Sequence, residues 1–327
     1  MKNEKKIPHI AVTMGDPSGI GPEIAVKVLA KGIYPIKIYG NEKLLLRTAK
    51  SIGLVINKKD IVNTFDLTNG QINEIIFGNP SKLTGETAYS AIERAVKDCL
   101  SGESSGIVTG PISKVGLNLA GHKWPGHTEL ISHLADPANP PKVRMVLLSE
   151  NFFIVLNSIH VSLKDAIFQL NEEILLDTLQ ITDDWCKKHN TFDIKYWVSG
   201  LNPHAGESGL LGDEETKIIN PFIKTALSKG FNISGPWPAD TLYMKIRRIN
   251  DVFFPKNVII SLYHDQALIP FKLDGLENGI NLTAGLPFLR TSVDHGTAYD
   301  IAGKGTASEI PLETAISKTQ ILASKIK

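Results

Sequence analysis

Three histidines stand in polar surroundings directly after apolar runs. His160 lies in SIHVS, His204 in NPHAGE and His264 in YHDQ. A neutral imidazole is a common ligand of divalent first-row metals, and three imidazoles with an open fourth position suit catalysis. The intervals of 44 and 60 residues between them match no local ligand motif such as HExxH. The sequence therefore allows a metal centre here, while a hydrogen-bonded structural role stays open for each histidine taken alone.

Basic and polar residues gather in the C-terminal third of the chain. Between positions 263 and 306 it is dense in Gly, Asp, His, Thr and Asn, but it keeps apolar residues throughout. Polar loops carried on a packed sheet are where functional sites are usually built. Lys272 and Arg290 could clamp a phosphate or a carboxylate. Because Arg290 stands inside GLPFLRTSVDHGT, its permanent charge needs a partner.

A glycine-rich junction, MGDPSGIGPE at 14–23, lies between a predicted strand and a predicted helix. Glycines allow tight turns, and the free N–H groups at a helix start favour an anion. The spacing GxxxGxG fits neither the dinucleotide fingerprint GxGxxG nor the phosphate loop GxxxxGK[ST]. Ligand contact and a plain turn with Pro22 at the first helical position both remain open.

Three shorter motifs allow a functional and a plain interpretation. GESSG at 102–106 matches the hydrolase nucleophile elbow, but a helix precedes it and a strand follows, so we predict a helix-terminating turn. GPISK at 110–114 follows a buried strand, so its lysine either reaches a ligand at the sheet edge or is solvated. In GHTE at 126–129, His127 and Thr128 either contact a phosphate or serve as a surface residue and a helix cap.

The composition excludes several classes of protein. The 327 residues carry 35 Lys and Arg against 34 Asp and Glu, so charge gives no reason to expect nucleic acid or an anionic membrane as a partner. Two cysteines, Cys99 and Cys186, cannot form a thiolate metal knuckle or a disulfide scaffold. No apolar run approaches the roughly 20 residues of a membrane span, and the N-terminus lacks a signal-peptide pattern. We expect a cytoplasmic protein.

Alternating strands and helices must position these groups. Strands are predicted at 10–14, 36–39, 106–110, 143–148, 152–156, 194–199 and 257–262, and the two around 149–151 could form a hairpin. Helices are predicted at 23–31, 42–51, 85–100, 172–189 and 213–229. Strands separated by helices indicate an α/β fold with a mainly parallel sheet. His160, His204 and His264 would then all lie at strand ends.

The motifs in their order are more specific than each alone. MGDPSGIGPE, GPISK, GHTE, NPHAGE, GPWPADT at 235–241, YHDQ and GLPFLRTSVDHGTA at 285–298 follow one another along the chain. Together they resemble the 4-hydroxythreonine-4-phosphate dehydrogenase family of pyridoxal-phosphate biosynthesis, over essentially the whole chain. NPHAGE and the last segment are the most specific.

This resemblance implies a fold similar to the isocitrate and isopropylmalate dehydrogenases. Two α/β domains would flank an active-site cleft, and the enzyme would be a homodimer whose site is shared across the subunit interface. We expect residues 1–130 with 285–327 to form the first domain. Residues 131–284 would form the second, which carries the metal and dimer contacts.

The resemblance also assigns roles to residues. A divalent ion (Zn, Mg or Co) would be bound by His160, His204 and His264. The implied substrate contacts are His127, Thr128, Lys272, Asn281 and Arg290. Asp240 and Asp265 match supporting carboxylates, and either Lys272 or Asp265 could be the general base. The nicotinamide cofactor, NAD or NADP, would lie near Gly285, Asp294 and His295. Which group holds the phosphate and which the carboxylate stays open.

The implied reaction oxidises 4-phosphohydroxy-L-threonine to 2-amino-3-oxo-4-phosphooxybutanoate, which decarboxylates to 3-amino-2-oxopropyl phosphate. An alternative within the family is oxidation of D-threonate or D-erythronate 4-phosphate. A metal-dependent phosphohydrolase is an alternative of a different class, because it would release phosphate without a nicotinamide. A non-enzymatic binding protein is a third, and the full set of polar motifs disfavours it.

Overall fold

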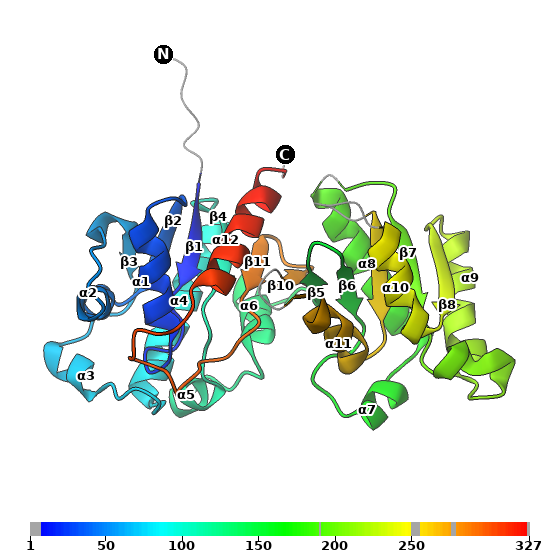
Figure 1. Cartoon of the computed structure of the whole chain (residues 1–327), viewed down its shortest axis with the longest axis horizontal. Helices are drawn as coiled ribbons and strands as arrows, with labels where there is room; N and C mark the ends of the chain where they lie inside the picture. The colour runs from blue at the N-terminus through cyan, green and yellow to red at the C-terminus, as the bar shows by residue number, and fades with distance from the viewer. Residues whose placement is uncertain (1–7, 190, 250–255, 276–278, 326–327) are drawn as a thin grey trace, which may run out of the picture. The chain divides into compact units, whose positions relative to one another are not determined.

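The computed structural model describes residues 8–189, 191–249, 256–275 and 279–325. The chain divides into two compact units. Among the described residues, unit 1 is formed by 8–141 and 286–324, and unit 2 by those between 142 and 285 together with Lys325. Each unit has its own strands and helices (Figure 1).

Unit 1 is built on a sheet with the strand order β3-β2-β1-β4-β11, in which all neighbours are parallel. The strands are β1 (His9–Thr13), β2 (Ile36–Gly40), β3 (Ile61–Asn63), β4 (Ser104–Thr109) and β11 (Leu289–Ser292). The helices are α1 (Gly21–Lys31), α2 (Glu42–Ser51), α3 (Asn69–Glu74), α4 (Lys82–Leu100), α5 (Lys114–Leu119), α6 (His127–Ala135) and α12 (Ile310–Ala323). The near-continuous burial of β1 and β4 is typical of parallel strands covered on both faces.

Unit 2 has the strand order β10-β5-β6-β9-β7-β8. β10, β5 and β6 are antiparallel neighbours, whereas β6, β9, β7 and β8 run parallel. The strands are β5 (Arg144–Leu148), β6 (Phe153–Leu156), β7 (Lys195–Ser199), β8 (Ile233–Trp237), β9 (Asn257–Ser261) and β10 (Ile280–Ala284). The helices are α7 (Leu163–Phe168), α8 (Glu172–Lys188), α9 (Asn220–Ser228), α10 (Ala239–Ile249) and α11 (His264–Gly275).

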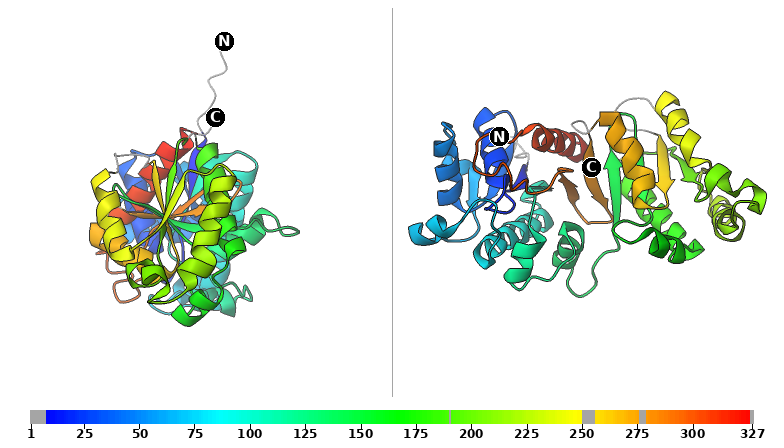
Figure 2. Two further views of the ribbon diagram at one scale, coloured as in Figure 1. Left: turned by 90° about the vertical axis from the view of Figure 1, so that its right-hand side faces the viewer. Right: turned by 60° about the horizontal axis from the view of Figure 1, so that its bottom comes forward.

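Alternate side chains of β6 face different helices of unit 2. Ile154 and Leu156 belong to a core with residues of α10 and α11, among them Leu242 and Phe271. Phe153 packs instead against Trp185 of α8, with ring centroids 5.8 Å apart. Because successive side chains of a strand point to opposite faces, these helices cover the sheet from both sides, as Figure 2 (left) shows. Both faces are therefore apolar, and polar side chains concentrate at the strand ends.

The predicted α/β class is confirmed, and so is the pairing of the strands on either side of 149–151, which are antiparallel neighbours. The predicted helix at 85–100 begins earlier, at Lys82, because Ser81 and Thr84 form a capping box. The predicted helix at 213–229 is not one regular helix. It starts with a π-helical segment, Glu215–Ile219, and becomes α-helical at Asn220.

The turn predicted for GESSG is confirmed. Helix α4 ends before it, and Gly102 has φ +79°, a left-handed conformation that favours glycine at a helix end. Ser104 already belongs to β4, so no helix follows the serine. The hydrolase elbow is therefore absent at this position.

The acidic side chains of the glycine-rich junction at 14–23 form hydrogen bonds with a segment of unit 1 that is distant in the sequence, residues 299–307. Asp16 accepts hydrogen bonds from Ser18 and from the Tyr299 hydroxyl at 2.8 Å. Glu23 accepts from the backbone N–H groups of Gly305 and Ala307. The acidic groups of the junction are thus occupied within the protein, which supports the turn interpretation. Pro22 is the second residue of α1, one position later than predicted.

None of the helices in the described ranges is long and apolar enough to cross a membrane.

Candidate active site

The three motif histidines of unit 2 follow neighbouring parallel strands. His160 comes after β6, His204 after β7, and His264 opens α11 directly after β9. In the sheet, β9 pairs with both β6 and β7. Their carboxyl ends therefore lie at one edge, which is where open α/β sheets bind ligands. The prediction that the histidines lie at strand ends is confirmed.

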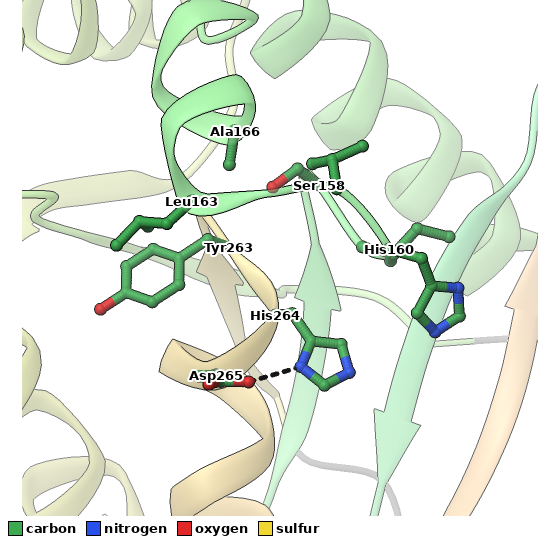
Figure 3. A pocket seen from close by; sticks show the side chains of 9 residues that line it. Ser158, His160, Leu163, Ala166, Tyr263, His264 and Asp265 are labelled. Atoms are coloured by element: carbon green, nitrogen blue, oxygen red, sulfur yellow. Dashed lines mark hydrogen bonds and ion pairs between the residues drawn. The ribbon is translucent and has the colours of Figure 1, made fainter.

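His160 and His264 line one pocket with a volume of about 270 Å³ (Figure 3). Their ring centroids are 5.7 Å apart. The Nδ1 atom of His264 is hydrogen-bonded to Asp265 at 2.6 Å. A carboxylate on one ring nitrogen fixes the tautomer and leaves Nε2 to bind a metal. Imidazole nitrogens suit a divalent transition metal, and Asp265 holds the His264 ring through Nδ1.

The third predicted ligand, His204, is exposed in the segment Pro203–Gly209 and does not line this pocket. Over the described part of the single chain, no group of three or more His, Cys, Asp or Glu side chains is placed to hold a metal ion. The structure thus brings two of the three predicted ligands together.

Unit 1 contains a separate set of predicted site residues around Arg290. Arg290 lies on β11 with only 3% of its surface exposed, and its Nη2 donates to Thr109 Oγ1 of β4 at 2.9 Å. Burial lowers the pKa of Arg290 to about 10, an effect that the nearby Glu129 carboxylate opposes. Arg290 therefore remains a cation at neutral pH. The predicted need for a polar partner is met by Thr109.

His127 is close enough to Arg290 to respond to its charge. Burial, and next the Arg290 cation, hold the pKa of His127 well below its usual value of 6.5, against a raising effect of a backbone hydrogen bond with Gly110. Its Nε2 atom is buried and has no hydrogen-bond partner among the described residues. Because the bond with Gly110 takes the ring N–H at Nδ1, the open Nε2 of the neutral ring is an acceptor. The Arg290 cation can therefore bind an anionic group, and His127 beside it can accept a hydrogen bond from a hydroxyl of the same molecule.

The remaining predicted substrate and catalytic residues lie on four different elements. Thr128 is half-buried in the first turn of α6 and is not its cap, because Gly126 holds that position. Asn281 on β10 has a buried Oδ1 without a partner in the described ranges. Lys272, near the end of α11, and Asp240, in the first turn of α10, are exposed. None of the four lines the pocket of His160 and His264.

The predicted cofactor residues lie on the segments around β11. Gly285 has φ +100°, and a Cβ there would come within 2.2 Å of the Lys142 carbonyl oxygen, so this position requires glycine. His295 Nδ1 lies 3.0 Å from its neighbour's carbonyl at Gly296, and its Nε2 is buried without a partner in the described ranges. Asp294 is half-buried beside it.

Several groups that shape these sites were not predicted. Thr109 is the last residue of the buried strand β4, and a polar residue at the end of an apolar strand could have indicated a site residue. Gln266 stands in YHDQ, of which only the histidine and aspartate were assigned roles. Glu215 lies in an ordinary polar stretch, GDEETK, and carries no signal in the sequence.

Histidines at strand ends in one unit and a buried arginine beside a neutral histidine in the other define an α/β enzyme that acts on an anionic small molecule. The chain belongs to the PdxA family, described as pyridoxal phosphate biosynthetic proteins, whose model matches residues 32–319. The resemblance inferred from the motifs is thereby confirmed.

Individual relatives cover nearly the whole chain. A "4-hydroxythreonine-4-phosphate dehydrogenase" of Beijerinckia indica is 40% identical over 94% of this chain and 92% of its own. A "D-threonate 4-phosphate dehydrogenase" of Salmonella typhimurium is 35% identical, over 96% and 98%. Among solved structures, a 4-hydroxythreonine-4-phosphate dehydrogenase from Klebsiella pneumoniae superposes with a TM-score of 0.85 at 34% identity, covering 97% of this chain and 99% of that one.

Proposed function

We propose that this protein oxidises the secondary alcohol of 4-phosphohydroxy-L-threonine with NAD or NADP as hydride acceptor. The 3-oxo acid formed then loses CO₂ to give 3-amino-2-oxopropyl phosphate, a step in the biosynthesis of pyridoxal 5'-phosphate. Membership of the PdxA family supports the reaction class. The observation that carries the proposal is the pair His160 and His264, with Asp265 on the second ring, in one pocket at the strand ends.

His160, His204 and His264 would hold a divalent ion (Zn, Mg or Co). When bound, the ion would supply Lewis-acid chemistry, making the substrate hydroxyl more acidic and polarising the ketone. Asp265 orients the His264 ring for this role. We place the working site in a homodimer, because the helix after His160 exposes apolar side chains, including Leu163 and Phe168, the latter 88% exposed.

Arg290 and His127 would bind one anionic end of the substrate. The burial of Arg290 strengthens the attraction, because little water screens its charge. Thr128, Lys272 and Asn281 would complete the substrate contacts, and Asn281 has a buried acceptor open for a donor. Holding the distant anion orients the reacting C–H bond toward the nicotinamide, for which we propose Gly285, Asp294 and His295 as neighbours. Lys272 and Asp265 are the two candidates for the general base, and the hydrogen bond of Asp265 to His264 gives that carboxylate an orienting role as well.

The second candidate is the oxidation of D-threonate 4-phosphate. Relatives of this name are 35–36% identical to this chain over 96% of its length. The two substrates share the phosphate and the secondary alcohol, so the same anion and metal groups would serve both. They differ in the group next to the alcohol, an amine or a hydroxyl.

Purified protein with Zn²⁺, Mg²⁺ or Co²⁺ and each substrate tests the proposal. We expect reduced nicotinamide and CO₂ in equal amounts, with the higher kcat/KM for 4-phosphohydroxy-L-threonine. A higher kcat/KM for D-threonate 4-phosphate would favour the second candidate. Release of inorganic phosphate without nicotinamide reduction would overturn both and indicate a phosphohydrolase.

A further inference from the structure

We propose that Glu215 and Gln266 are positioning residues that tie together the loops of His204 and His264 and thereby set the affinity of the site for a divalent metal. The inference rests on the proposed function, since it takes these histidines as ligands. It is carried by a continuous set of hydrogen bonds at the ends of β6, β7 and β9 in unit 2.

The loop of His204 has an unusual backbone conformation. Five consecutive residues have left-handed φ values, namely 54° at His204, 54° at Ala205, 78° at Gly206, 44° at Glu207 and 59° at Ser208. Residues other than glycine rarely adopt this region, and they keep it only where surrounding contacts hold them. Such backbone strain clusters at functional sites.

Glu215 holds this loop at its start. Its side chain is buried with 2% of its surface exposed, although it is a carboxylate. Oε1 accepts from the backbone N–H groups of Leu201 and Asn202, both at 2.8 Å, and Oε2 accepts from the Asn202 side-chain amide at 2.8 Å. The charge is thus stabilised by three donors just before His204. A charged acceptor strengthens each of these bonds, so the loop has little freedom to rearrange.

Gln266 connects this loop to the loop of His264. Its side chain is 7% exposed. Nε2 donates to the carbonyl oxygen of Gly200 at 2.7 Å, at the end of β7, and Oε1 accepts from the N–H of Leu262 at 2.8 Å, at the end of β9. One amide therefore sets the separation of two strand ends, each within four residues of a proposed ligand.

Ser158 extends the connection to the third histidine. Ser158 stands two residues before His160 in the chain, and its hydroxyl donates to the carbonyl oxygen of Leu262 at 2.9 Å. The backbone of Leu262 thus accepts a hydrogen bond from Ser158 at its carbonyl oxygen and donates one to Gln266 from its N–H. The three loops form one hydrogen-bonded frame. Removal of a hydrogen-bond partner of a ligand side chain typically changes metal affinity by about 10- to 100-fold, and this frame acts on the backbone that carries the ligands.

The test compares Glu215→Gln and Gln266→Leu with the wild type. In Glu215→Gln an N–H₂ group must face at least one of the donors that now bind the carboxylate. We expect the Kd for Co²⁺ or Zn²⁺, measured by titration of the metal-free protein, to rise by about 10-fold or more in both variants. Glu214→Gln is the matched control, because Glu214 reaches only the Asn202 amide in this network; its Kd should stay within threefold.

Stability is separated from positioning by measuring thermal unfolding of the metal-free variants. A structural role alone would lower Tm and leave the metal Kd of the folded protein unchanged, and that result would overturn the inference. If Glu215→Gln does not fold, Gln266→Leu and the shorter Glu215→Asp decide the question by the same measurement.

His204→Ala distinguishes a failure of the proposed ligand set from a failure of the proposed positioning role. If it leaves the metal Kd unchanged, the proposed ligand set is wrong; if it abolishes binding while the positioning variants bind normally, only the present inference is wrong.

Discussion

The two candidate sites of this protein differ in their access to water. In unit 1, Arg290 is buried and the Nε2 of His127 is enclosed. In unit 2, His160 is exposed, and 35% of the His264 side chain is accessible at the edge of an open pocket. A fixed charge in a dry environment binds an anion strongly and stays in place. Imidazoles at an open edge can bind a metal ion and a substrate whose charge changes during the reaction. The difference in access to water therefore fits substrate recognition in unit 1 and chemistry in unit 2.

The largest effect is expected from His160→Ala. We expect turnover to fall by roughly 1,000-fold or more, since a bound metal contributes several kcal/mol to transition-state stabilisation. The fold should persist, because the side chain is exposed and surface changes typically alter stability by less than about 0.5 kcal/mol. Steady-state kinetics with metal analysis checks this, with the exposed neighbour Lys164→Ala as control. Full turnover with full metal content would break the assignment of chemistry to unit 2.

Arg290→Met should have the next largest effect. It removes the buried cation while keeping the side chain's bulk. Loss of one partner of a buried charged contact costs about 2–5 kcal/mol, so we expect kcat/KM to fall by about 30- to 5,000-fold. Metal affinity, measured in the absence of substrate, should be unchanged. A large loss of metal binding in this variant would show that the two sites do not divide the work as proposed.

Thr109→Val should have a smaller effect of the same kind. It removes the hydroxyl that binds Arg290 Nη2 and keeps the shape of the side chain. A hydrogen bond to a charged group contributes about 1.5–3 kcal/mol, which corresponds to roughly 10- to 150-fold in kcat/KM. Thr13→Val on the neighbouring strand β1 is the matched control, because its hydroxyl binds the backbone of Gly110 instead. Equal losses in both variants would argue for a general packing effect.

The smallest predicted effect is on stability at acidic pH. The pKa of His127 in the folded protein lies below its usual value of 6.5, because burial and Arg290 disfavour the charged ring. The unfolded chain then binds a proton that the folded chain does not, so the free energy of unfolding falls as the pH drops below about 6.5. Above that pH both states are neutral and the effect vanishes. Urea unfolding at pH 5 and pH 7.5 should show a smaller difference for His127→Gln than for the wild type. An identical pH dependence in the two proteins would count against a His127 that is neutral in the folded protein.

Local patterns predicted much of the framework. Apolar runs located β1, β2, β6 and β9, and polar residues after those runs pointed to the strand-end site of His160 and His264. The resemblance of the ordered motifs identified the family. The rule for parallel strands was sufficient here because it depends only on strand direction.

Contacts between distant segments were beyond the reach of such patterns. Thr109 and Arg290 are separated by 181 positions and meet only because β4 and β11 pair. Tyr299 reaches Asp16 over 283 positions. Glu215 was missed because a buried carboxylate and a solvated one look alike in a polar segment.

The amino-acid sequence by itself therefore determined the class of fold, the family and the identity of the chemical groups, since periodicity and motif order are properties of the chain. The tertiary structure decided which groups are desolvated and which are open to water. It enclosed His127 beside Arg290, left His160 and His264 at an accessible edge, and committed Glu215 to the loop of His204. The physical reason is that burial and charge act through space, and their effect on a residue depends on neighbours that the chain brings together only when it folds.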